Sequence, residues 1–138
     1  MGLPFHYVDL RAFCYATEDE AAVRDALRTL LPEDADIQAA EGEGHHGDRI
    51  VVLSARVERA ADIESIFSRL EAGLEVDRIR AELDDRLDDN NALYIGLDKQ
   101  AAARGDVELG DGLTLRAKVE AYPAKREAAL ENAREALE

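Results

Sequence analysis

Two adjacent histidines, His45 and His46, lie between glycines, with Asp48 two residues further on. Imidazole exchanges protons near neutral pH and a carboxylate can orient it, so acid–base catalysis is one chemistry open to this segment. Adjacent histidines are poorly placed to ligate one metal ion, and the chain contains no Cys-X-X-Cys or His-Glu-X-X-His motif. We therefore expect no metal, no cofactor and no catalytic residue, and interpret the segment as a turn whose histidines contact a partner.

Aromatic and basic residues alternate with aliphatic ones in several predicted strands. Between residues 5 and 16, one alternating set is largely aliphatic, and the other includes Tyr7, Arg11, Phe13 and Tyr15. The matching set in later strands comprises Ser54, Arg56, Tyr94, Thr114, Arg116, Lys118 and Tyr122. A sheet face of this kind can stack unpaired bases and hold phosphates. Alternatively, the tyrosines lie beneath a further helix with their hydroxyls at its rim.

The segment Leu97-Asp98-Lys99-Gln100-Ala101 follows a predicted strand and contains one of only three lysines in the chain. A lysine and a glutamine at a strand end could contact phosphate and ribose, with Arg104 close behind. Alternatively, Asp98 caps a short helix and Lys99 is solvated.

The chain is strongly acidic, with 31 acidic and 17 basic residues and a net charge of −14 among 138 residues. Charge spread over the surface repels itself in dilute buffer, and concentrated salt screens that repulsion. Arginine also greatly outnumbers lysine. We interpret the chain as a cytoplasmic protein of a halophile. Alternatively, its acidic residues bind cations or basic partners. The stretch 97–126 is nevertheless net positive, which suggests a local basic site.

A membrane or secreted protein is not expected. No apolar run approaches the length of a membrane span, and the N-terminus lacks a secretory pattern. The single cysteine, Cys14, excludes an internal disulfide framework and fits a reducing compartment.

Hydrophobic periodicity predicts one α+β domain over residues 1–138, in the order β-α-β-β-α-α-β-β-α. A capping box places Thr17 as the N-cap of the first helix, with Glu20 three residues on. The sheet is expected to be mostly antiparallel, with helices packed on it. The strands are predicted over residues 5–16, 37–43, 50–58, 93–97 and 113–121. The helices are predicted over 18–31, 61–70 and 76–87 and from Pro123 onward, with a short helical or irregular link over 99–105.

Three motifs, in this order, resemble a small archaeal family of RNA-binding proteins described as predicted exosome subunits: Gly44-His45-His46-Gly47-Asp48, the Leu97–Ala101 segment, and Leu113-Thr114-Leu115-Arg116-Ala117-Lys118-Val119. The resemblance runs from about Phe5 to Lys125, and the acidic composition is similar to that of a haloarchaeal member. It implies a fold like that of the 5S-rRNA-binding ribosomal protein of the large subunit, and non-catalytic RNA binding. It also implies exosome- or ribosome-related protein partners. Members often carry a basic residue where this chain has Gly96.

We therefore expect a non-catalytic RNA-binding protein, an accessory of RNA processing or degradation. Alternatives are a protein–protein adaptor that uses the same face, and a small hydrolase or nuclease built on His45, His46 and Asp48. The residues expected to contact RNA are Arg11, His45, His46, Arg49, Tyr94, Lys99, Gln100, Arg104, Arg116 and Lys118.

Overall fold

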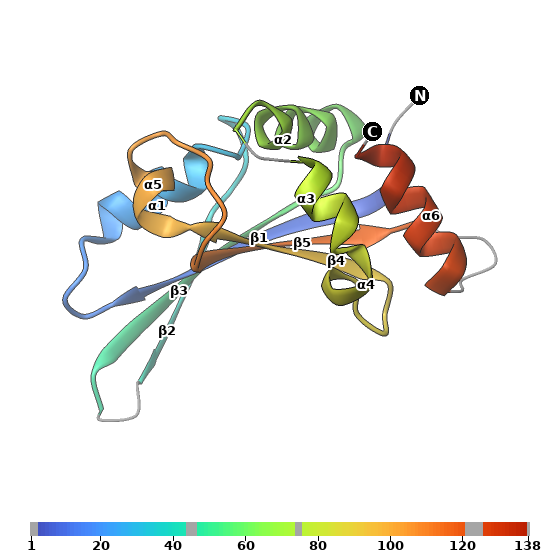
Figure 1. Ribbon diagram of the computed structural model, residues 1–138. Helices are drawn as coiled ribbons and strands as arrows, with labels where there is room; N and C mark the ends of the chain where they lie inside the picture. Colours follow the sequence, from blue (N-terminus) through green and yellow to red (C-terminus); the bar gives the residue numbers. More distant parts are fainter. Residues whose placement is uncertain (1–2, 44–46, 74–75, 121–125, 138) are drawn as a thin grey trace.

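A single five-stranded sheet forms the centre of the molecule (Figure 1). The computed structural model describes residues 3–43, 47–73, 76–120 and 126–137. The strand order is β2-β3-β1-β5-β4, and every neighbouring pair is antiparallel. This confirms the predicted antiparallel α+β fold. The strands are β1 (Phe5–Tyr15), β2 (Gln38–Glu43), β3 (Arg49–Val57), β4 (Ala92–Asp98) and β5 (Gly112–Val119).

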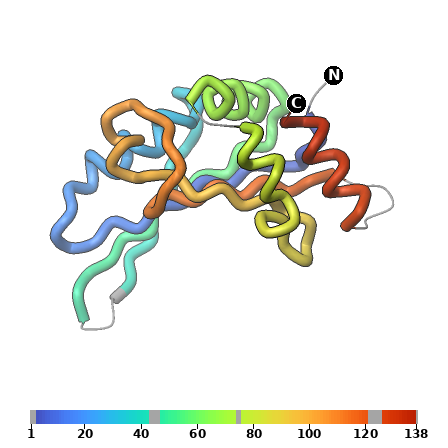
Figure 2. The backbone as a smooth tube through the Cα atoms, viewed as in Figure 1, coloured from blue at the N-terminus to red at the C-terminus, as the bar shows by residue number. Residues whose placement is uncertain are grey.

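The helices form a layer on one face of the sheet, except that α4 lies beside the edge strand β4 (Figures 1 and 2). The opposite face carries no described helix. The helices in the described part of the chain are α1 (Glu20–Arg28), α2 (Ala60–Gly73), α3 (Val76–Ala81), α4 (Leu83–Arg86), α5 (Lys99–Ala103) and α6 (Arg126–Ala136). None of them is long and apolar enough to cross a lipid bilayer.

The core lies between the sheet and the helix layer. From Val8 to Cys14, strand alternation sends every second side chain of β1 into it, as predicted. Leu10, Leu115 and Ile95 are neighbours across three strands and are fully buried. Phe5 of β1 stacks on Phe67 of α2 with ring centroids 4.6 Å apart. Aliphatic and aromatic packing thus fixes which face the helices cover.

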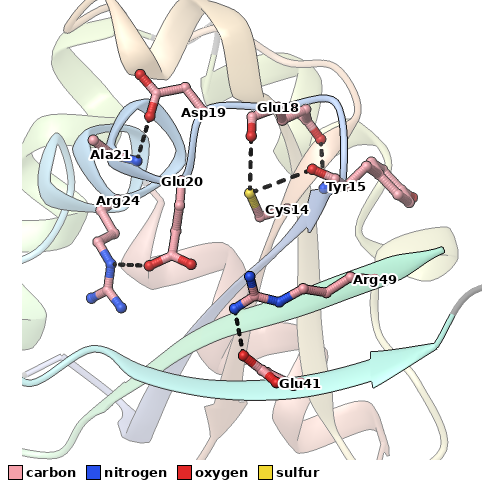
Figure 3. A network of polar contacts seen from close by, with 9 residues as sticks. All are labelled: Cys14, Tyr15, Glu18, Asp19, Glu20, Ala21, Arg24, Glu41 and Arg49. Atoms are coloured by element: carbon pink, nitrogen blue, oxygen red, sulfur yellow. Dashed lines mark hydrogen bonds and ion pairs between the residues drawn. The ribbon is translucent and has the colours of Figure 1, made fainter.

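The N-terminus of α1 differs from the prediction. Asp19, and not Thr17, is the N-cap: its carboxylate accepts a hydrogen bond of 3.0 Å from the amide of Ala21 (Figure 3). Glu18, which precedes the cap, is instead engaged with Lys99 and with the backbone of Tyr15. Aspartate caps helices as well as threonine does, so local sequence left either start possible.

The prediction of one continuous helix over residues 76–87 is wrong. The structure divides this segment at Glu82 into α3 and α4. Ile79, Leu83 and Leu87 are nevertheless buried, as their spacing predicts. Leu87 forms an isolated antiparallel bridge with Leu93 of β4. One straight helix could not form this bridge to β4, so the chain bends between α3 and α4.

Candidate nucleic-acid interface

The sheet face away from the helix layer is here called the open face. Its strand positions carry the second alternating set predicted from the sequence. The members are Tyr7, Asp9, Arg11, Phe13 and Tyr15 of β1, Ser54 and Arg56 of β3, Tyr94 of β4, and Thr114, Arg116 and Lys118 of β5. No described helix covers these side chains, so the alternative that the tyrosines lie beneath a helix is wrong for Tyr7, Tyr15 and Tyr94. Tyr122 lies outside the described residues.

A row of alternating charges crosses the middle of the open face. The register places Arg56, Asp9, Arg116 and Tyr94 side by side on β3, β1, β5 and β4. Asp9 accepts two hydrogen bonds from Arg56, of 2.7 and 3.0 Å. Its carboxylate also lies 3.7 Å from the guanidinium of Arg116. One aspartate therefore holds two arginines in place.

Aromatic rings flank these arginines. The guanidinium of Arg56 lies over the ring of Tyr7, 3.9 Å from its centroid. Arg116 donates a hydrogen bond of 3.1 Å to the Tyr7 hydroxyl, and its guanidinium lies 5.8 Å from the ring centroid of Tyr94. Cation–π and hydrogen-bond contacts of this kind restrict the arginine rotamers.

Both arginines keep their charge. The hydrogen bond with Asp9 raises the pKa of Arg56 above its usual value. Burial opposes the charge of Arg116, but its neighbours Tyr7 and Tyr94 raise the pKa of Arg116 overall. Both groups are therefore permanent cations.

The open face is hollowed around this row. A depression of about 790 Å³ is lined by Arg11, Ser54, Arg56, Tyr94 and Arg116 among others. Asp9, Asp36 and Glu58 line it as well, so the acidic and basic side chains balance. Attraction by net positive charge is thus weak here, whereas stacking and hydrogen bonding are available.

The exposed aromatic residues gather on the same face. Among the described residues, the large hydrophobic side chains that remain exposed are Phe13, Tyr15 and Tyr94, at 39%, 50% and 37%. All three belong to the open face. Burying aromatic surface is favourable, so three exposed rings on one side indicate a binding surface.

The predicted contact residues separate into groups. Four of them, Arg11, Tyr94, Arg116 and Lys118, lie on the open face. Arg11 places its guanidinium 5.5 Å from the ring centroid of Phe13. The Lys118 ammonium donates to the backbone carbonyl of Asn90. The structure therefore brings together the sheet residues of the predicted site.

Three further predicted residues, Lys99, Gln100 and Arg104, belong to α5 or its C-terminal end. This helix packs against α1 in the helix layer, although the Lys99 ammonium lies 5.2 Å from the ring centroid of Tyr15 on β1. Asp98 caps α5 by accepting from the amide of Ala101, as the structural alternative predicted. Lys99 is not solvated: its side chain is 13% exposed and pairs with Glu18 at 2.7 Å.

The last group of predicted contact residues comprises Arg49, His45 and His46. Arg49 pairs with Glu41 across β2 and β3 (Figure 3). It belongs to the same alternating set as the buried Val51 and Leu53, so it lies on the helix side of the sheet and not on the open face. His45 and His46 lie outside the described residues, so their prediction is untested. Within residues 3–43, 47–73, 76–120 and 126–137, no three His, Cys, Asp or Glu side chains are grouped as ligands for a metal ion.

Sequence reasoning missed Asp9 as the organising residue of the open face. Alternation placed it on the correct side, but its two partners, Arg56 and Arg116, come from strands far away in the chain.

Gly96 stands where members of the family that the sequence resembles often carry a basic residue. The close approach of the Gly110 backbone explains the glycine here. A Cβ atom at this position would lie 2.7 Å from the carbonyl oxygen of Gly110.

Comparison with known proteins identifies the family. The model of a family described as RNA binding matches residues 7–119. The chain belongs to this family. RNA-binding protein PAB1135 of Pyrococcus abyssi is 34% identical over 147 aligned positions, which cover 99% of this chain and 96% of that protein. The RNA-binding family thus accounts for nearly the whole chain.

Solved structures share the fold of this member of the RNA-binding family. Protein AF2318 from Archaeglobus fulgidus superposes with a TM-score of 0.87 at 33% identity, covering 96% of this chain and 99% of that one. Mth689 from Methanothermobacter thermautotrophicus gives 0.81 at 40% identity, with coverage of 97% and 98%. Both are described as DUF54 proteins. A UPF0201 protein from Methanococcus jannaschii, at 18% identity and a TM-score of 0.68, shares the fold alone.

Proposed function

We propose that this protein is a non-catalytic RNA-binding protein that holds RNA on the open face. The observation that carries the proposal is the position of the exposed aromatic residues Phe13, Tyr15 and Tyr94, all on the face that the helices leave free. Arg11 and Arg116 lie beside two of these rings. Bases stack on aromatic rings, and guanidinium groups bind phosphate or stack on bases. Membership of the RNA-binding family supports the same function.

The charge of the chain determines how such binding works. A net charge of −14 repels a polyanion at low salt. Concentrated salt removes that repulsion, but it also removes most of the free energy gained by counterion release. Affinity then depends on stacking, hydrogen bonds and shape, which the balanced, aromatic-rich open face supplies.

We propose a cytoplasmic accessory of RNA processing or degradation, because the sequence motifs resemble those of predicted exosome subunits. No catalytic step is assigned to the chain. His46→Ala tests this point: if the purified protein degraded RNA and the substitution abolished that activity, a nuclease would replace the accessory role.

Ultraviolet crosslinking to RNA in concentrated potassium chloride, followed by peptide mapping, tests the binding face. We expect crosslinks in peptides of β1, β4 and β5. Crosslinks confined to α5 or to the peptide that contains His45 and His46 would move the site away from the open face. A complete lack of crosslinks would favour an adaptor that binds protein through the same exposed rings.

A further inference from the structure

Phe13 and Tyr15 form an exposed pair of rings at one end of the open face, here called the aromatic pair. The two residues are two positions apart on β1, so both side chains leave the same side of the sheet. Their ring centroids are 6.4 Å apart and their planes differ by 27°. The pair therefore presents a nearly continuous aromatic surface to solvent.

The surroundings of the aromatic pair leave room for a flat ligand. Across β3 and β2, the register places Val52 and then Ala40 beside Phe13, and Ile50 and then Gly42 beside Tyr15. On each side, the residue two strands away from the ring is therefore small: it has a methyl group in one case and no side chain in the other. The surface beside the rings is apolar and low.

The backbone under the aromatic pair is fixed from the helix layer. Lys99 donates a hydrogen bond of 2.8 Å to the carbonyl oxygen of Phe13 and pairs with Glu18. Glu18 in turn accepts a hydrogen bond of 3.1 Å from the amide of Tyr15 (Figure 3). The Lys99 ammonium also lies 5.2 Å from the Tyr15 ring centroid. Because this backbone is already fixed, the aromatic pair loses little conformational entropy when a ligand binds.

We propose that the aromatic pair is a second stacking site for unpaired RNA bases, distinct from Tyr94. This inference rests on the proposed RNA-binding function and names its substrate class, single-stranded RNA. Strand geometry places Phe13 about 16 Å from Tyr94, because the register separates them by two strands and four residues. Bases inside a duplex are covered by their neighbours and cannot reach either ring. One strand with splayed bases can reach both.

The arginines between the two stacking sites favour RNA over a protein partner as the occupant. Arg11 lies next to Phe13, and Arg116 lies next to Tyr94. A backbone that passes from one aromatic site to the other therefore crosses guanidinium groups, which bind phosphate oxygens. The two sites and the cations between them belong to one continuous face.

Ring resonances of the phenylalanines provide a test with an internal control. The chain has three phenylalanines, and Phe5 and Phe67 are buried in their own stack. We expect a random-sequence single-stranded RNA pool, added in concentrated potassium chloride, to shift the Phe13 ring signals and leave the other two unchanged. An unmoved Phe13 signal while RNA binds would overturn the inference.

Affinity measurements separate the two stacking sites. Phe13→Ala and Tyr15→Ala should each weaken binding of the single-stranded pool by roughly 5- to 150-fold, the range for loss of one stacked base. Phe13→Tyr should retain affinity because the ring remains. The control is Ser68→Ala, at an exposed position of α2 in the helix layer, which should leave affinity within about twofold of wild type. Circular dichroism confirms that each variant is folded.

The outcomes distinguish this inference from the proposed function. If Tyr94→Ala weakens binding but neither substitution in the aromatic pair does, the second site is wrong and the open-face function stands. If the wild-type protein binds no RNA, both fail. If a duplex RNA pool of the same length binds as tightly as the single strands, the assignment to single-stranded RNA is wrong.

Discussion

Lys99 pairs with Glu18 at 2.7 Å, although 81 residues separate them in the chain. The contact joins the first residue of α5 to the turn between β1 and α1. Both groups are partly buried, with side chains 13% and 29% exposed. The lysine of the Leu97–Ala101 motif thus has a structural role beside the strand that carries the aromatic pair.

The Glu18–Lys99 pair should make stability depend on pH. Burial opposes ionisation of Glu18, but hydrogen bonds from Lys99 and from the Tyr15 amide outweigh it, so the pKa of Glu18 is lowered. This stabilisation is present above the unfolded-state value of about 4.3 and is lost as pH falls through the lower folded-state pKa. At neutral pH, Glu18→Gln should reduce the free energy of unfolding by about 1.5–3 kcal/mol. The difference from wild type should vanish in acid.

Urea denaturation of both proteins in concentrated salt, from neutral pH into acid, measures this difference. Glu20→Gln is the control, since Glu20 forms an exposed pair with Arg24. That substitution should change stability by no more than about 0.5 kcal/mol. Equal effects of the two substitutions would contradict the role given to Glu18.

Tyr94→Ala should weaken RNA binding more than Lys118→Ala. Losing one stacked ring removes about 1–3 kcal/mol of binding free energy. Loss of one phosphate contact changes little in concentrated salt, because counterion release contributes little there. In addition, the Lys118 ammonium already binds the carbonyl of Asn90. Fluorescence anisotropy in concentrated potassium chloride compares the two, and the opposite order would indicate binding dominated by phosphate contacts.

Gly96→Ala should destabilise the fold although it adds only a methyl group. The new Cβ would lie 2.7 Å from the backbone carbonyl of Gly110, which cannot rotate away. Overpacking of this kind costs about 1–3 kcal/mol. Gly42→Ala is the matched control, since its Cβ would lie 4.0 Å from the Ile50 carbonyl, an ordinary contact. Thermal denaturation of both variants tests the difference, and equal melting temperatures would contradict it.

The protein should lose structure in dilute buffer. Its 31 acidic residues repel one another when salt no longer screens them. Circular dichroism during dialysis from concentrated potassium chloride should report loss of helical signal and a lower melting temperature, both regained when salt is restored. Unchanged structure and melting temperature would argue against adaptation to high salt.

Local sequence determined the strands, the division of their residues between two faces, and most helices. Alternation in β1 separated Leu10 and Ala12 from Tyr7 and Arg11, because strand side chains point to opposite faces. The burial of Ile63, Ile66 and Phe67 likewise follows from their helical spacing. These features depend on neighbours within a few residues, so the pattern was sufficient.

Tertiary structure alone decided which residues share a surface. Arg56, Asp9 and Arg116 meet only because β1 lies between β3 and β5, an order that no local pattern fixes. In the same way, only the packing of α5 against α1 places Lys99 against Glu18 and beside the Tyr15 ring. Strand order and helix docking result from burying the whole core at once, so the composition of the open face depends on contacts between distant segments.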